Sequence, residues 1–374
     1  MQRTIRIQLQ PDVKTALVLA QTIKQYTWSF NAVCNYGWEY HLSSGAELHK
    51  ATYYDHRTIT KLPAQLVCAA RVKATEALKS VRARQRKKEV VSCPQSKFCA
   101  IRYDARSYTV WFDRYELTLL TLNGRVKLPF QLAVYYKQYL SWTRTSADLI
   151  RDRKGRWWLH VVMETSPPVV VPNEETIGVD LGINNPATDN LDNFYGEKHW
   201  KNIEDRTFEL RRRLQSKGTK SAKKRLKKLS GRQRRFRRDC DHVLSKRLVQ
   251  SVKSGTTIAF EDLTHIRGRV KAKKAQRRRL HGWSFAQFQA FVGYKAEGCA
   301  VSVGFVDPRY TSLKCSQCSH IERGNRPEQA KFKCKKCGFE SHADLNAAIN
   351  IRSDFLKCRA AVNPPIAVCP EMGS

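Results

Sequence analysis

The hydrophobic pattern of the first half of the chain changes its period twice. Apolar residues alternate over positions 1–10, which predicts a half-buried strand, and recur at helical spacing over 13–38 and about 63–88, which predicts two helices. Short β-rich runs bounded by turn residues, including the Asn-Gly pair at 123–124, fill positions 98–166 and predict a β-meander or small barrel. We expect the first strand to join that barrel, which makes the helical stretch an insertion.

The second half begins after residues 167–175, which carry three prolines and are predicted to be a linker. Apolar strands are predicted in "TIGVD", "TTIAFE" and "AVSVGFV", and helices around 241–252 and in "WSFAQFQAFVGYKAEG". Between the first two strands, residues 211–238 hold fifteen Lys or Arg and no acid, and their apolar residues are too sparse for a core helix. A helix containing "DLNAAINI" ends the ordered part, and a loose tail is expected beyond about residue 358.

The charge of the chain indicates what this fold binds. It has 68 Lys and Arg against 33 Asp and Glu, a formal net charge of +35, and so large an excess calls for a polyanionic partner. Nucleic acid is the first candidate, and a membrane surface is the rival. The sequence has no apolar run of about 18 residues, and its first residues lack the apolar segment of a signal peptide. We therefore expect a soluble intracellular protein.

Four of the twelve cysteines form two CxxC pairs separated by fifteen residues, Cys315 with Cys318 and Cys334 with Cys337. Each pair turns tightly enough to place two sulfurs on one ion, so the pattern predicts a tetrahedral zinc ribbon. With four protein ligands no position is left for water, and the metal should be structural. An iron–sulfur site is the alternative, whereas the length of the chain argues against a disulfide scaffold. The remaining cysteines are expected to be reduced thiols.

Three carboxylates stand at the ends of predicted elements. Asp180 and Glu261 each end an apolar strand, and Asp344 begins the last helix. Two Mg²⁺ ions about 4 Å apart need several shared carboxylates, one ion activating water and the other stabilising the leaving oxygen of a phosphodiester. Each acid alone could instead be a surface residue or, for Asp344, a helix cap. The three together, in so basic a chain, favour a site that cleaves a polyanion.

An ordered set of motifs resembles the TnpB family, the transposon-encoded relatives of type V CRISPR effectors. The motifs are "IGVDLGINNPAT", "IAFEDL", "VDPRYTSLKCSQC" and the ribbon before "HADLNAAINI". The resemblance covers roughly residues 1–356 and is strongest over 177–351. It implies a RuvC-like nuclease of the ribonuclease H fold, in which Asp180, Glu261 and Asp344 match the catalytic trio.

The resemblance also implies an α+β, multidomain architecture. The expected domains are a wedge-like β-barrel over 1–10 and 93–170, a helical recognition insertion over 11–92, a RuvC-like α/β nuclease domain over 171–312 and 341–357, a zinc ribbon that handles target nucleic acid over 313–340, and a flexible tail over 358–374. One departure is Ser319, where the family usually has Gly after the first knuckle. Because Ser can occupy such a turn with modest strain, zinc binding is still expected.

The function implied by the resemblance is that of an RNA-guided DNA endonuclease of transposon origin. It cuts double-stranded DNA beside a short flanking motif, directed by a guide RNA from the transposon end, with two Mg ions and one structural Zn ion. We expect it in the cytoplasm of a bacterium or archaeon, associated with the nucleoid, as a monomer or a homodimer. The alternatives are a nucleic-acid-binding repressor without cleavage, which should have lost an acid, and a transposase or its accessory protein.

Two basic segments lie between and after the carboxylate strands, residues 211–238 and a loop over 267–280 with eight Lys or Arg. Such segments can follow phosphates by counterion release, which positions a nucleic acid without reading its sequence. The candidate nucleic-acid-binding residues are Arg211, Arg212, Arg213, Lys223, Lys224, Arg234, Arg235, Lys273, Arg278 and Arg309. Aromatic residues in the helical stretch "YTWSFNAVCNYGWEY" could stack on bases, although core packing is favoured for most of them.

Overall fold

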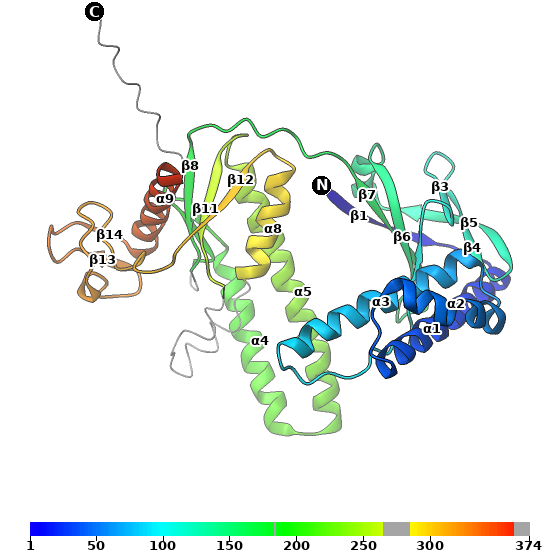
Figure 1. Cartoon of the computed structure of the whole chain (residues 1–374). Coiled ribbons are helices and arrows are strands. Elements are labelled where there is room, and N and C mark those ends of the chain that lie inside the picture. The colour runs from blue at the N-terminus through cyan, green and yellow to red at the C-terminus, as the bar shows by residue number, and fades with distance from the viewer. Residues whose placement is uncertain (183–184, 265–284, 363–374) are drawn as a thin grey trace, which may run out of the picture. The chain divides into compact units, whose positions relative to one another are not determined.

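The computed structural model describes residues 1–182, 185–264 and 285–362, which divide into two compact units (Figure 1). The first unit is Met1–Ser166, and the second begins at Pro167. Residues 167–175, which precede the first strand of the second unit, form no helix or strand, in agreement with the predicted linker.

The first unit is built on one sheet of seven strands in the order β2-β6-β7-β1-β5-β4-β3. The strands are β1 (Gln2–Leu9), β2 (Ile101–Tyr103), β3 (Tyr108–Trp111), β4 (Glu116–Thr121), β5 (Gly124–Leu132), β6 (Thr143–Arg151) and β7 (Trp157–Glu164). Strand β1 lies in the middle, antiparallel to β5 and β7, so the first strand joins the later ones as predicted. The outermost strands, β2 and β3, are consecutive in the chain, and the sheet is a nearly closed barrel.

Three helices are inserted between β1 and β2, namely α1 (Val13–Glu39), α2 (Gly45–Thr60) and α3 (Ala64–Arg86). Helix α1 buries an apolar stripe at helical spacing that includes Leu19, Ile23 and Tyr26, and its core is continuous with that of the sheet. Helix α2 was not predicted. Its buried stripe contains one aliphatic residue, Leu48, followed by Thr and His at four-residue spacing, so the hydrophobic signal is weak.

The second unit contains a five-stranded sheet in the order β10-β9-β8-β11-β12. The strands are β8 (Thr176–Asp180), β9 (Ala187–Asp189), β10 (Phe194–Tyr195), β11 (Thr257–Glu261) and β12 (Ser302–Val306). Strands β8, β11 and β12 are parallel, while β9 and β10 add antiparallel pairs at one edge. Strands β9 and β10 are too short to give a sequence signal. The mixed sheet agrees with the predicted ribonuclease H-like fold.

Opposite faces of this sheet are covered by different helices. Ile177 and Val179 of β8 share a core with α5 (Lys220–Gln250) and α8 (Phe285–Glu297). The residue between them, Gly178, lies in register with Ala259 of β11, which is in register with Gly304 of β12. Helix α9 (Ala343–Val362) packs over this row of small residues (Figure 1).

The strand and the helix touch through their backbones. A Cβ atom at Gly178 would lie 2.2 Å from the carbonyl oxygen of Ala348 and 2.5 Å from the backbone nitrogen of Arg352, both in α9. Asp344 lies about one helical turn before Ala348. The close approach therefore fixes Asp344 at the carboxyl end of β8, and a Cβ at Gly182, just beyond β8, would lie 3.6 Å from its Oδ2.

Two segments of the second unit are more helical than predicted, and the predicted start of the tail was wrong. The basic segment 211–238 is helical, because α4 (Lys198–Lys217) and α5 form a hairpin that turns at Gly218 in the left-handed region. Lys and Arg have high helix propensity, and the ion pair of Arg237 with Glu204 at 2.7 Å joins the two helices. Helix α9 also continues to Val362, past the predicted start of the tail at 358.

Candidate functional site

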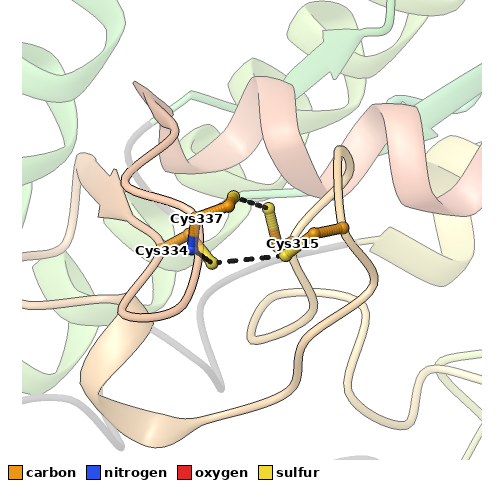
Figure 2. Close-up of side chains that lie close together, drawn as sticks. Cys315, Cys334 and Cys337 are labelled. Carbon is orange, nitrogen blue, oxygen red and sulfur yellow. Dashed lines mark hydrogen bonds between the residues drawn. The ribbon is translucent and has the colours of Figure 1, made fainter.

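The two cysteine pairs meet in a module between β12 and α9. Figure 2 shows three of the four cysteines, Cys315, Cys334 and Cys337. The Sγ atoms of Cys315 and Cys337 are 3.7 Å apart, those of Cys318 and Cys334 are 3.6 Å apart, and all four lie within 4.8 Å of one another. A tetrahedron with zinc–sulfur bonds of about 2.3 Å requires sulfurs about 3.8 Å apart. A disulfide requires about 2.05 Å. The cluster therefore has the dimensions of a four-thiolate metal site.

The turn after each knuckle has the same geometry in both pairs. Ser319 donates its backbone N–H to the carbonyl of Cys315 at 2.9 Å, and Gly338 donates to that of Cys334 at 3.1 Å. Both residues have a positive φ, 60° for Ser319 and 75° for Gly338. The departure from the family pattern is accommodated as expected, because Ser takes the conformation that Gly adopts in the second turn, at a cost of about 1 kcal/mol.

The two knuckles are also tied to each other. Asn325, which is fully buried, donates to the carbonyls of Leu313 and His320 and accepts from the backbone N–H of Lys335 at 2.9 Å. A hairpin of β13 (Lys331–Lys333) and β14 (Glu340–His342) then leads into α9. The module is thus a small ribbon, connected directly to the helix that carries Asp344.

The three predicted acids converge at one end of the five-stranded sheet. Strands β8 and β11 are parallel with Val179 opposite Phe260, so Asp180 and Glu261 end neighbouring strands at the same edge. Desolvation and the negative charges of Glu261 and Asp344 raise the pKa of Asp180 well above its usual value. The three carboxylates therefore interact electrostatically, although they come from positions up to 164 residues apart.

The carboxylates are more widely spread than the thiolates. Over residues 1–182, 185–264 and 285–362, the four cysteines are the only group of three or more His, Cys, Asp or Glu whose ligand atoms all lie within 4.8 Å of one another. A pair of Mg²⁺ ions about 4 Å apart, each about 2.1 Å from its ligands, spans a wider group than one ion does. The wider spread of the three acids is compatible with a two-ion site.

Three neighbours of the acids were missed by sequence reasoning. Asp344 accepts from Asn185 Nδ2 at 2.9 Å and pairs with Arg326 Nη2 at 3.3 Å, and the buried hydroxyl of Thr311 donates to Glu261. Desolvation raises the pKa of Glu261, against the lowering effects of Thr311 and Arg326. Arg326 belongs to the cysteine module, and nothing in its local sequence separates it from the other bases.

The acid cluster has an excess of negative charge. Arg326 pairs with one carboxylate and lowers the pKa of the other two, yet the pKa values of Asp180 and Glu261 remain raised. Burial is the main cause of both raised values, and for Asp180 the charges of Glu261 and Asp344 add to it, so compensating positive charge would favour the ionised forms. Divalent cations with oxygen ligands supply such charge, so the cluster is chemically suited to Mg²⁺.

Eight of the ten candidate nucleic-acid-binding residues lie in the described ranges, and all eight are exposed. They are Arg211, Arg212 and Arg213 on α4, Lys223, Lys224, Arg234 and Arg235 on α5, and Arg309 in the segment after β12. The remaining two, Lys273 and Arg278, lie outside the described residues. The α4–α5 hairpin therefore presents seven of the candidates on one helical pair.

The aromatic residues of the helical insertion mostly belong to the core, as favoured by the sequence. Tyr26 and Phe30 are buried, whereas Tyr54 is 77% exposed. Among the residues that the structure describes, there is no helix with the length and apolar character needed to span a membrane.

Comparisons with known proteins agree with this geometry. Residues 160–264 match the family described as "Probable transposase" (OrfB_IS605), and residues 285–351 match the Cas12f1-like TNB domain. The chain is 34% identical over 219 residues to the CRISPR-associated endodeoxyribonuclease Cas12f1 of Sulfoacidibacillus thermotolerans, covering 54% of this chain and 50% of that protein. It is 33% identical over 166 residues to the TnpB-like protein MJ0751 of Methanocaldococcus jannaschii, covering 44% of this chain and 59% of that protein.

The fold is also found in a solved structure, a cryo-EM complex of Cas12f1 with sgRNA and target DNA. It aligns with a TM-score of 0.64 at 16% identity, over 91% of this chain and 83% of that one. The chain spans about half the length of the curated relatives it matches. The predicted resemblance to the TnpB family and the predicted α+β fold class are both confirmed by these matches.

Proposed function

Starting from this similarity to the TnpB family, we propose that the chain is an RNA-guided DNA endonuclease of transposon origin. A guide RNA from the transposon end directs it to double-stranded DNA beside a short flanking motif, where it hydrolyses a phosphodiester bond. The observation that carries the proposal is the convergence of Asp180, Glu261 and Asp344 at one edge of the second sheet. The names of the relatives, an endodeoxyribonuclease among them, support the same reaction class.

In this proposal Asp180, Glu261 and Asp344 would hold two Mg²⁺ ions, which would supply Lewis acidity toward the scissile phosphate and toward a water molecule. Burial and the negative charges of both other acids raise the pKa of Asp180, so a bound cation would stabilise its ionised carboxylate. Thr311 orients Glu261, and Asn185 orients Asp344. Arg326 stands beside the acids, where a guanidinium can bind the oxygens of the phosphate that the acids repel.

The cysteine cluster has a separate role in this proposal. Four thiolates saturate a tetrahedral Zn²⁺ ion and leave no position for substrate, so the ion is structural. It holds the module in the fold that delivers Arg326 to Asp344. The exposed bases of the α4–α5 hairpin bind the phosphates of the guide RNA or the DNA, without reading their sequence.

The test begins with the RNA that copurifies with the protein. We expect that RNA to be one defined species. With this RNA bound and Mg²⁺ present, the protein should cut target plasmids from a library that varies the flanking motif. Asp180→Asn should abolish cutting while RNA and DNA binding persist. Asp192→Asn, at an exposed acid in the turn between β9 and β10, is the matched control and should cut normally.

The outcomes separate the alternatives. Binding without cutting by the unaltered protein means a repressor, and joining of strands means a transposase. Undiminished cutting by Asp180→Asn removes the carboxylate assignment.

A further inference from the structure

Two asparagines of α9 are buried and have no role in the site described so far. Asn346 is 0% exposed and Asn350 is 1% exposed. They are four residues apart, so they lie on the same face of the helix. Burying an amide without hydrogen bonds costs about 1–3 kcal/mol, so the partners of these two side chains indicate what the helix holds in place.

Both side chains bind the backbone of one short segment, residues 311–316. Asn346 donates to the carbonyl of Lys314 at 2.9 Å and accepts from the N–H of Ser316 at 3.0 Å. Asn350 donates to the carbonyls of Thr311 at 2.9 Å and Lys314 at 2.6 Å. The segment has no regular helix or strand of its own beyond a single β-bridge, and these four hydrogen bonds join it to α9, in addition to the bond that Asn325 donates to the carbonyl of Leu313.

The same segment contacts both candidate ion sites. Thr311, at its start, donates to Glu261, and Cys315, near its end, is one of the four thiols. Lys314 adds an ion pair with Asp354, farther along α9, with both side chains at most one quarter exposed. Helix α9, which supplies Asp344, therefore also holds the segment that contains Thr311, the hydrogen-bond donor to Glu261, and Cys315 of the cysteine cluster.

We propose that Asn346 and Asn350 are positioning residues that couple the thiolate site to the carboxylate site, so that an ion on the cysteines sets the placement of Glu261 and Asp344. The inference rests on the proposed function in taking the acids as a divalent-cation site. An ion on Cys315 fixes one end of the segment, and the asparagines carry that constraint along it to Thr311. Losing either anchor frees the Thr311 hydroxyl from Glu261.

The test measures cation binding without guide RNA, DNA or cleavage. Mn²⁺ affinity is followed by electron paramagnetic resonance, and zinc content is measured on the same samples. Asn350→Ala should keep one zinc per chain and bind Mn²⁺ about tenfold more weakly, because it loses two hydrogen bonds of about 0.5–1.5 kcal/mol each. The unaltered protein stripped of zinc should lose Mn²⁺ affinity at least as much.

Two further variants define the route of the coupling. Thr311→Val replaces the hydroxyl with a methyl group. The double variant with Asn350→Ala should bind Mn²⁺ no more weakly than whichever single variant binds it more weakly, because both changes interrupt the same connection. The matched control is Asn190→Ala, which removes another side-chain hydrogen bond of the second unit, 2.8 Å from the N–H of Gly178. It should lower the melting temperature and leave Mn²⁺ affinity unchanged.

Each outcome bears on one claim. Fully additive losses in the double variant, an equal loss in Asn190→Ala, or unchanged Mn²⁺ affinity in both Asn350→Ala and the zinc-free protein would overturn the coupling. If Asn350→Ala does not fold, Asn350→Ser, which retains a donor, replaces it and should bind Mn²⁺ more weakly than the unaltered protein, and Thr311→Val still tests the coupling. If Asp180→Asn binds Mn²⁺ like the unaltered protein, the carboxylate assignment itself fails, a result distinct from failure of the coupling.

Discussion

A single methyl group added at Gly178 should separate two of the three proposed catalytic acids. In Gly178→Ala the new Cβ starts 2.2 Å from the carbonyl oxygen of Ala348 and 2.5 Å from the backbone nitrogen of Arg352. Real Cβ contacts are essentially never shorter than 3.0 Å. Because both neighbours are backbone atoms of α9, no side chain can rotate away, and the helix must move off β8 by about 1 Å.

The displacement has two measurable consequences. Overpacking of this kind costs about 1–3 kcal/mol of folding free energy, which lowers the melting temperature by several degrees. Asp344 moves with α9 while Asp180 stays with β8, and a misplacement of about 1 Å costs on the order of 100-fold in rate. Single-turnover cleavage by the RNA-loaded protein, with thermal unfolding of the same sample, measures both.

Gly304→Ala is the matched control, since the same helix covers Gly304. Its Cβ would lie 2.2 Å from a ring carbon of Phe355, a side chain that can shift, and Phe355 is eleven residues after Asp344, about 16 Å along the helix. This variant should lose stability but keep most of its cleavage rate. Wild-type rate and stability in Gly178→Ala, or equal loss of rate in both variants, would refute the reasoning.

Three other perturbations test separate parts of the account. Because the pKa of Asp180 is raised in the folded protein, protonation of this carboxyl stabilises the fold. That contribution is fully present below the unfolded pKa of about 3.9 and is lost as the pH rises through the folded pKa. Without divalent ions, Asp180→Asn should thus melt higher than the unaltered protein at pH 7.5 and no higher near pH 4; equal melting at pH 7.5 contradicts the repulsion. Ser319→Gly should slow zinc release to a chelator by relieving about 1 kcal/mol of backbone strain, whereas Gly338→Ala should speed it, and the reverse order would exclude strain at the knuckles. Replacing Arg234 and Arg235 by Ala should reduce the slope of log affinity against log salt by about 1–2 for nucleic acid, and an unchanged slope would remove them from the interface.

Local patterns were enough for part of this protein. The CxxC spacing predicted the cysteine cluster because each knuckle is made within four residues, and Asp180 and Glu261 were recognisable because each ends an apolar strand. The helical insertion followed from the 3.6-residue period of α1 and α3. Where the period was weak, as in α2 and α4, no helix was predicted, because those helices bury little apolar surface.

By itself, the sequence determined which residue types this protein brings to its chemistry: four thiols, three acids and a large excess of bases. Only the tertiary structure decided which residues support them. Arg326, Thr311 and the two asparagines of α9 reach partners that are 18 to 50 residues away, through hydrogen bonds and an ion pair that no local sequence pattern indicates. In the sequence, Gly178, Ala259 and Gly304 are likewise three separate small residues. Only the parallel pairing of their strands aligns them in a row, against which helix α9 packs.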